Sequence, residues 1–463
     1  MRSWGVVVLL IVGCAGGERR PNVVLVTIES LRTDHVGAYG GRSRTRPDEP
    51  LTPALDALAS EASVYENAHA TSSWTLTSHA SLFTSLYPTG HQTTRPLDRL
   101  ADSYVTLAEV LAANGYQTHG VVTGPYLRGP YNLHQGFDVW DQRAASAKLA
   151  KSHGDRTNPY VEQSVARFVR AGRDPSRPFF LFLYLWDPHY DYLPSPPYDR
   201  RFVTPACEPF DLSHWETRDD VDRLSPARLM YVWSQYEGEI RATDDLLGRL
   251  FVLLREAGLW DDTLVIVTAD HGEEFFEHGK RGHKNNLYAE SVDVPLIVKY
   301  PGAGPARRDT RVASLVDVLP TVLEVAGLAA EGHRDGRSLL AAATPDRAVL
   351  LELVSLSYQG HMFPAGVYWG GIRTADRKLV WREQRPDGGT GTVDLIQLFD
   401  VAADPGEQRN LAAARQDEAK AMMARFDTTA SATRVEAARH DERGLAAIGE
   451  SDRARLRALG YLE

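Results

Sequence analysis

The sequence predicts an α/β fold in which a mostly parallel, doubly wound sheet is followed by a small antiparallel sheet. Three runs, 22–28, 179–186 and 263–268, are almost entirely apolar and lie between segments with helical periodicity. Strands buried on both faces of a parallel sheet have this composition, whereas half-exposed antiparallel strands alternate apolar and polar residues. After about residue 327 the pattern changes to short strand-like runs separated by Gly, Pro and Asp, which is typical of a small antiparallel sheet.

Capping residues and apolar spacing predict the helices. Thr52 can cap a helix that begins at Pro53, and Thr77 or Ser78 can cap a second helix over 80–86. Two further segments have an apolar face at helical spacing, 236–256 and 317–326. The strand-like runs of the C-terminal part are 349–354, 366–374, 378–381 and 395–401.

These elements divide the chain into three parts after its N-terminal segment. A large α/β domain covers 21–330, a small antiparallel subdomain covers 345–411, and a helical tail covers 412–463. With 463 residues, 43% hydrophobic and 24% charged, the chain is globular rather than disordered or fibrous. Its net charge of -10, without a run of Lys or Arg, excludes nucleic acid as an expected partner.

The N-terminal segment 1–13 has the layout of a lipoprotein-type signal peptide. Arg2 is followed by an apolar run over 5–13 and by small residues around Cys14. Residues 10–14 resemble a bacterial lipobox, in which the cysteine becomes the lipidated first residue; a plain signal peptide is the alternative. We therefore expect an exported protein of the bacterial cell envelope, periplasmic or on the outer surface, attached to the membrane through lipid on Cys14. Cys207 is then the one cysteine left in the chain, so a framework of disulfide bonds is excluded.

Each of the three apolar strands ends in residues of the types that commonly bind metals. The first runs into Glu29, the second into Asp187 and His189, and the third into Asp270 and His271. Ligands of open α/β sheets bind outside the carboxyl ends of the strands, so we expect these side chains to share one site.

A segment rich in hydroxyl groups, 70–84, precedes and opens a helix. Backbone N–H groups and the helix dipole favour an anion at such a position, so Thr75 is placed to face a phosphate or sulfate group. The alternative is that these hydroxyls only cap the helix.

Several segments, in this order along the chain, resemble the sulfatase family of the alkaline-phosphatase superfamily. The matching segments are 21–26, 78–84, 268–273, Tyr288 with 294–297, 398–400 and 404–411. The resemblance implies an alkaline-phosphatase-like fold and an anionic ester substrate. It places Thr75 where sulfatases hold the Cys or Ser that becomes formylglycine, Asp270 and His271 at metal ligands, His189 at an active-site histidine, and Lys284 at a lysine that contacts the anionic group.

The chain departs from the formylglycine type of sulfatase at important positions. Formylglycine cannot form at Thr75, His79 stands where an arginine is expected, and Glu29-Ser30 stands where paired aspartates are expected. This altered set is similar to that of lipoteichoic acid synthases and phosphoethanolamine transferases, which place Glu, Thr, Asp and His around one divalent ion and use the Thr as nucleophile. The corresponding residues are Glu29, Thr75, Asp270 and His271, and His283 matches a further histidine of the transferases.

The residue types indicate the metal and the roles around it. Carboxylates together with an imidazole favour Zn or Mn over Ca, although Ca is possible. A threonine hydroxyl needs a bound cation to become a good nucleophile. We expect His189, His283 and Lys284 to bind the oxygens of the anion or to protonate the leaving group. Alternatively, Asp187, His189 and His283 hold a second ion. His278 is expected to be a solvated loop residue.

Three functions remain open from the sequence. The first is an exported, metal-dependent hydrolase or transferase that acts on phosphoric esters through a Thr75 intermediate. The second is a sulfuric ester hydrolase that works without formylglycine. The third is an inactive binding protein with the sulfatase fold. Substrate specificity in such folds depends on loops such as 191–215, whose sequence does not identify the substrate.

Overall fold

The computed structural model describes residues 20–145, 157–213, 224–302, 306–329, 331–355, 366–385, 391–440, 444–450 and 453. The predicted signal peptide, Cys14 and most of the chain beyond residue 450 lie outside these ranges. Within them, no helix is both long enough and apolar enough to cross a membrane.

An eight-stranded sheet forms the centre of the molecule, in the order β11-β2-β10-β7-β1-β6-β4-β5. β1 pairs in parallel with β6 on one side and with β7 on the other. These three strands are the three predicted from the sequence, with ends that differ by at most one residue. β10 runs antiparallel to β7 and to β2, so the sheet is mostly parallel, as predicted. The strands are β1 (Asn22–Ile28), β2 (Ser63–His69), β4 (Gln117–Val122), β5 (Val139–Asp141), β6 (Phe179–Leu185), β7 (Thr263–Ala269), β10 (Leu296–Lys299) and β11 (Arg307–Ser314).

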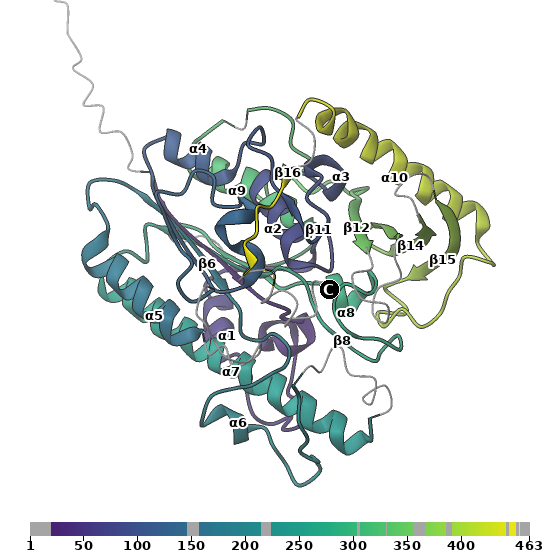
Figure 1. The fold of residues 1–463 in the computed structure, drawn as a ribbon, viewed down its shortest axis with the longest axis horizontal. Helices are drawn as coiled ribbons and strands as arrows, with labels where there is room; N and C mark the ends of the chain where they lie inside the picture. Colours follow the sequence, from purple (N-terminus) through teal and green to yellow (C-terminus); the bar gives the residue numbers. More distant parts are fainter. Residues whose placement is uncertain are drawn as a thin grey trace, which may run out of the picture.

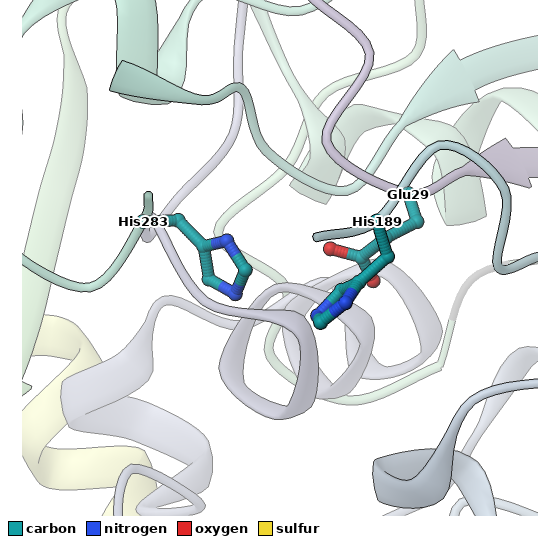
Figure 2. A group of neighbouring side chains, drawn as sticks. All are labelled: Glu29, His189 and His283. Carbon is teal, nitrogen blue, oxygen red and sulfur yellow. The ribbon is translucent and has the colours of Figure 1, made fainter. Parts of the chain in front are cut away.

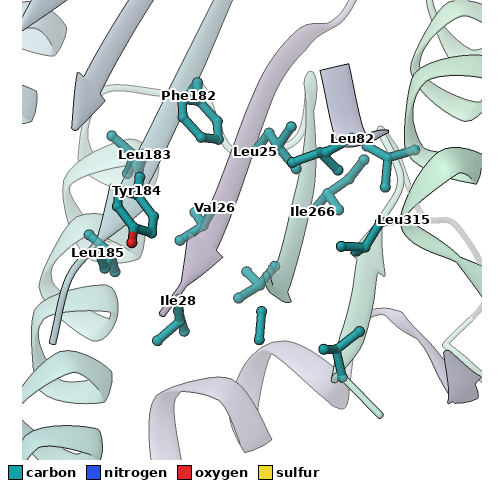
Figure 3. Packing of buried hydrophobic residues seen from close by; sticks show 14 of the residues in the cluster. Leu25, Val26, Ile28, Leu82, Phe182, Leu183, Tyr184, Leu185, Ile266 and Leu315 are labelled. Carbon is teal, nitrogen blue, oxygen red and sulfur yellow. The ribbon is translucent and has the colours of Figure 1, made fainter. Parts of the chain in front are cut away.

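Helices cover both faces of this sheet (Figure 1). One layer contains α7 with α1 and α5 packed against it, and the other contains α2 with α4 and α9 packed against it. The helices are α1 (Pro53–Ala59), α2 (Thr75–Thr84), α4 (Leu107–Ala113), α5 (Asn158–Arg167), α7 (Pro226–Glu256) and α9 (Val318–Val325). Side chains from β1, β6 and β7 pack with residues of α2 in one continuous core (Figure 3). All seven residues of each of these three strands are buried.

The predicted helix starts need correction. α2 begins at Thr75 rather than at residue 80, and Thr77 and Ser78 lie inside it. Their hydroxyls donate to the carbonyl oxygens of Thr93 and Ser72, and so they do not cap the helix. Thr52 precedes α1 but makes no capping hydrogen bond. α7 begins ten residues before the predicted start, where Ser225 caps a first turn that is partly exposed and therefore lacks a clear apolar face.

The C-terminal part forms a four-stranded antiparallel sheet in the order β12-β13-β14-β15, as predicted. Its strands are β12 (Val349–Ser355), β13 (Val367–Arg373), β14 (Arg377–Gln384) and β15 (Thr392–Asp400). α10 (Gln416–Ala437) packs on this sheet, with Phe426 against Trp381 in a second core cluster. The chain then returns to the large sheet's side of the molecule, where β16 (Gly444–Leu445) pairs with β3 (Asp98–Arg99).

Short elements connect these parts. They are η1 (Thr33–His35), η2 (Gly37–Tyr39), α3 (Pro88–His91), η3 (Pro125–Leu127), η4 (Gly129–Tyr131), η5 (Phe168–Gly172), α6 (Tyr198–Arg201), β8 (Glu274–Phe275), β9 (Arg281–Gly282), α8 (Ala289–Val292) and η7 (Leu315–Asp317).

Candidate active site

The carboxyl ends of β1 and β7 and the first residue of α2 meet at one point. The Thr75 hydroxyl donates to Glu29 Oε2 at 3.2 Å and lies 3.3 Å from His271 Nε2. His271 Nε2 is 3.0 Å from Glu29 Oε1 and 3.6 Å from Asp270 Oδ2. All four residues are at most 1% exposed. The structure thus brings together the four predicted ligands, because β1 and β7 are parallel neighbours and their ends reach the same edge of the sheet.

Two further hydroxyls bind the Glu29 carboxylate. The Ser30 hydroxyl donates to Oε1 at 2.9 Å, and the Tyr184 hydroxyl donates to Oε2. Burial alone would raise the pKa of Glu29, but the imidazole of His271 outweighs this and holds the pKa below its ordinary value. Glu29 is therefore a carboxylate with four polar partners, one of which is the Thr75 hydroxyl.

The other two ionisable groups, Asp270 and His271, also have pKa values that differ from the ordinary ones. Burial and the neighbouring Glu29 charge raise the pKa of Asp270 well above its ordinary value. Burial opposes protonation of His271, but the charges of Asp270 and Glu29 raise its pKa to about 9. Asp270 Oδ2 is buried and has no hydrogen-bond donor among the described residues. A divalent cation would satisfy this oxygen and compensate the two carboxylates, so the donor set fits a metal ion.

Three histidines of the site each have an oxygen acceptor beside the same ring nitrogen, Nδ1. His271 Nδ1 lies 2.8 Å from the carbonyl oxygen of Gly272, and His283 Nδ1 lies 3.1 Å from Glu273 Oε1. His189 Nδ1 lies 2.5 Å from the carbonyl oxygen of Tyr190. An oxygen at Nδ1 holds a proton there, so that Nε2 is the nitrogen that could bind a metal ion in place of a second proton, which is the usual arrangement of metal-binding histidines.

Potential metal ligands form two groups that share Glu29. The first contains Asp270 and His271, and the second contains His189 and His283; within each group the ligand atoms lie within 4.8 Å of one another. Figure 2 shows the second group, with His189 beside Glu29 and His283 extending toward them from another segment. Asp187, which the sequence alternative placed with these two histidines, belongs to neither group, and its backbone carbonyl accepts a hydrogen bond from the Thr243 hydroxyl.

Lys284 follows His283 and lies close to the nucleophile segment. It is 8% exposed, and its backbone N–H donates to the carbonyl oxygen of Ser73, two residues before Thr75. Its Nζ is 5.8 Å from the centre of the Tyr190 ring, in the loop that also carries His189. His189 and His283 therefore reach Glu29 from two loops, and the backbone of Lys284 is hydrogen-bonded to the segment that precedes Thr75.

The sequence did not indicate the role of Tyr184, which lies inside an apolar run. The direction in which its side chain points depends on how β6 pairs with β1, and the sequence alone does not show this pairing. The family resemblance placed His79 where an arginine is expected but gave no role to this residue, which lies one turn after Thr75. His79 Nδ1 is 2.8 Å from the carbonyl oxygen of Thr75 and Nε2 is 2.9 Å from the Thr27 hydroxyl. Burial lowers the pKa of His79 to about 4, so its ring is neutral and does not replace the charge of an arginine.

The prediction that His278 is a solvated loop residue is wrong. Its ring stacks on Tyr288 at 3.7 Å, and Nδ1 lies 2.7 Å from Glu290 Oε1. Nε2 faces the carbonyl oxygen of Glu407 at 3.2 Å. His278 therefore lies between the large domain and the antiparallel sheet.

The doubly wound sheet carries a hydroxyl, two carboxylates and three imidazoles at its carboxyl edge, a set of groups that suits a metal-dependent hydrolase of anionic esters. The chain belongs to the sulfatase family: the model of that family matches residues 21–328. A second model, the C-terminal part of N-sulphoglucosamine sulphohydrolase, matches residues 277–432. Sulfatase-family enzymes are metal-dependent, in agreement with the two ligand groups.

Known proteins of two kinds are similar to this chain. Arylsulfatase K of Xenopus laevis is 24% identical over 91% of this chain and 84% of its own length. A multifunctional alkaline phosphatase superfamily protein, PehA of Trinickia caryophylli, is 27% identical over 69% of this chain and 76% of its own length. Among solved structures, the phosphonate monoester hydrolase of Agrobacterium radiobacter has a TM-score of 0.70 at 21% identity, covering 89% of this chain and 96% of that one. The putative sulfatase yidJ of Bacteroides fragilis has a TM-score of 0.71 at 20% identity, covering 91% and 98%.

Proposed function

We propose that this protein hydrolyses phosphoric esters through a covalent intermediate on Thr75. The observation that carries the proposal is the position of the Thr75 hydroxyl at the first residue of α2, between Glu29 Oε2 and His271 Nε2. Backbone N–H groups at the start of a helix favour the anionic group, and the hydroxyl oxygen is close to where that group would bind.

The step follows from these contacts. Thr75 Oγ1 forms a bond to phosphorus as the bond between phosphorus and the leaving alcohol oxygen breaks, and water then hydrolyses the phosphothreonine. Glu29 Oε2, 3.2 Å from Thr75 Oγ1, takes the hydroxyl proton, and the leaving alcohol oxygen receives a proton from His189, His283 or Lys284. We assign His189, His283 and Lys284 to the oxygens of the phosphoryl group and to the leaving group.

Glu29, Thr75, Asp270 and His271 would hold the metal ion. When bound, the ion lowers the pKa of the Thr75 hydroxyl and neutralises charge on the transferred group. The imidazole nitrogen favours Zn or Mn over Ca, which prefers oxygen ligands. The second group, Glu29 with His189 and His283, could hold a further ion, and the number of ions per chain in the purified protein decides between one and two.

A sulfuric ester hydrolase is the second candidate, and the arylsulfatase K relatives favour it. The residue at position 75 argues against it, since a sulfate ester of threonine lacks the second hydroxyl through which a formylglycine enzyme expels sulfate. PehA, a multifunctional member of the superfamily, supports an active site that accepts more than one ester type.

The test is a substrate screen with the metal content measured on the same sample. We expect phosphate monoesters, diesters or phosphonate esters to be turned over faster than sulfate esters, and Zn or Mn to be present. Peptide mass spectrometry after an acid quench should find a phosphoryl group on Thr75. Faster turnover of sulfate esters would refute the assignment. Transfer to an added alcohol, rather than to water, would make the protein a transferase.

We further propose that the protein is exported and attached to the bacterial cell envelope through lipid on Cys14. The support is the sequence of residues 1–14, with its basic start, apolar middle and small residues before the cysteine.

A further inference from the structure

The segment 404–411 forms a tight turn that is fixed to the edge of the antiparallel sheet. The carboxylate of Asp404 accepts hydrogen bonds from the backbone N–H groups of Gln408 and Arg409, at 3.2 and 2.7 Å. Asn410 Oδ1 accepts from a backbone N–H of β15 at 3.1 Å, and its Nδ2 donates to a carbonyl of the same strand at 3.0 Å. These bonds define the position of Glu407, which is 3% exposed and has a φ of 54°.

Glu407 points out of this turn and caps a helix of the large domain. Its carboxylate accepts two hydrogen bonds from Lys378 Nζ, at 2.8 and 3.0 Å, in a pair that is almost fully buried. Oε2 also accepts the backbone N–H of Ala289, the first residue of α8, at 3.0 Å. The residue before it, Tyr288, offers no side-chain cap. The Glu407 carboxylate, which belongs to the turn beside the antiparallel sheet, thus accepts a hydrogen bond from an N–H group that has no partner within α8.

α8 in turn supports the loop of the predicted metal ligand His271. The backbone carbonyls of Glu290 and Ser291 accept hydrogen bonds from the N–H groups of Glu273 and Gly272, at 2.8 and 2.9 Å. The contact is so close that a Cβ at Gly272 would lie 2.0 Å from the carbonyl oxygen of Glu290. Any shift of α8 is therefore passed to residues 272 and 273.

These two residues orient two histidines of the active site. The carbonyl oxygen of Gly272 holds His271 Nδ1, and the carboxylate of Glu273 holds His283 Nδ1. A continuous series of hydrogen bonds therefore connects Glu407, through α8, to His271 and His283.

We propose that Glu407 is a positioning residue for the active site, which sets α8 and, through it, His271 and His283. The inference rests on the proposed role of these two histidines. It also gives the segment 404–411 a function: the antiparallel sheet is required to hold the metal loop in place, as well as for folding.

The experiment must remove the cap without leaving Lys378 buried and unpaired, which by itself would destabilise the protein. We therefore compare two double variants, Lys378→Met with Glu407→Gln and Lys378→Met with Glu407→Leu. Both lack the ion pair and both keep a residue with a side chain at the same positive φ, but only glutamine keeps an oxygen that can accept the Ala289 N–H. Glu418→Gln is the matched control, since Glu418 lies on α10 and pairs with Arg377, next to Lys378, rather than with α8.

Three measurements are made on the full chain: hydrogen exchange over residues 271–291, the dissociation constant for Zn²⁺ or Mn²⁺, and kcat with KM. Relative to the glutamine variant, the leucine variant should exchange faster over 271–291, bind the metal about 10-fold more weakly and lose kcat more than KM rises. Glu418→Gln should behave as the unmodified protein in all three.

The results separate the inference from the proposed function. Equal exchange over 271–291 in the two double variants would overturn the positioning role, whatever the activity. Faster exchange with unchanged metal affinity would also overturn it, because the loop would then move without affecting His271. An absence of Thr75-dependent turnover in the unmodified protein would instead refute the proposed function while leaving the exchange and metal comparisons intact.

Discussion

Replacing Thr75 separates its chemical role from its structural one. The residue is 1% exposed, and its hydroxyl contacts Glu29 and His271. Thr75→Val removes the hydroxyl and keeps the shape, so the expected loss of stability is one hydrogen bond, about 1 kcal/mol, because Glu29 keeps its other partners Ser30 and Tyr184. Thr75→Ser keeps the hydroxyl and loses a buried methyl group, which also costs about 1 kcal/mol.

The expected effects on turnover differ far more. Removal of a nucleophile costs on the order of 10⁴-fold or more in kcat, which corresponds to about 5 kcal/mol of activation free energy. Thr75→Val should therefore lose nearly all turnover at almost the same stability as Thr75→Ser, and Thr75→Ser should keep part of the activity because the attacking oxygen remains. Steady-state kinetics and urea unfolding of both variants, with the covalent adduct followed by mass spectrometry, provide the comparison.

One outcome would refute this reasoning directly. If Thr75→Val retained the turnover of Thr75→Ser on the best substrate, the hydroxyl would not be the attacking group. A water or another side chain would then have to take that role, and the position of Thr75 at the start of α2 would be only structural.

Four further predictions follow from particular contacts. Asp270→Ala should lose metal and activity together, and a variant that keeps stoichiometric metal by elemental analysis would contradict the ligand assignment. Gly272→Ala should weaken metal binding, measured by titration, because its Cβ would collide with a backbone carbonyl of α8. Burial lowers the pKa of His91 from 6.5 to about 3, so below pH 6.5 the unfolded chain takes up a proton that the folded state does not bind. The free energy of unfolding should therefore fall by roughly 5 kcal/mol as the pH decreases from 6.5 toward 3, and urea unfolding of His91→Gln should show a smaller decrease in that range. Cys14→Ser should release the protein from the membrane fraction, and an unmodified soluble form of the unchanged chain, cleaved elsewhere, would refute the lipid anchor.

The parts of the fold that could be predicted are those with one dominant physical signal. β1, β6 and β7 are buried on both faces, so their composition alone identified them. β2 escaped prediction because its run contains Glu66 and Asn67, one exposed and one half-buried. α2 was started too late because hydroxyl residues both cap helices and occur inside them, and only the partners of Thr77 and Ser78 distinguish the two cases.

In the candidate active site, too, some residues could be predicted from the sequence and others could not. Glu29, Asp270 and His271 follow strand ends, and parallel pairing is enough to bring strand ends together. The position of Thr75 in the site came from the family resemblance. The grouping of His189 and His283 with Glu29 instead of Asp187 depends on side-chain directions in a loop, and the contact of Tyr184 with Glu29 depends on the register in which Tyr184 lies beside Thr27. Neither can be obtained from sequence spacing.

The pairing of β16 with β3 has a mechanical consequence. The antiparallel sheet and α10 are connected to the large domain at both ends, through the segment before β12 and through β16. A unit attached at two points can still turn about the line that joins them, but it cannot move away from the large domain as a whole without breaking one of the two connections. Thr75 is 1% exposed, so we expect a substrate to reach its hydroxyl through movement of nearby loops, such as the loop of His189 and Tyr190. Cross-linking β16 to β3 would leave turnover unchanged, whereas restraining that loop would slow it.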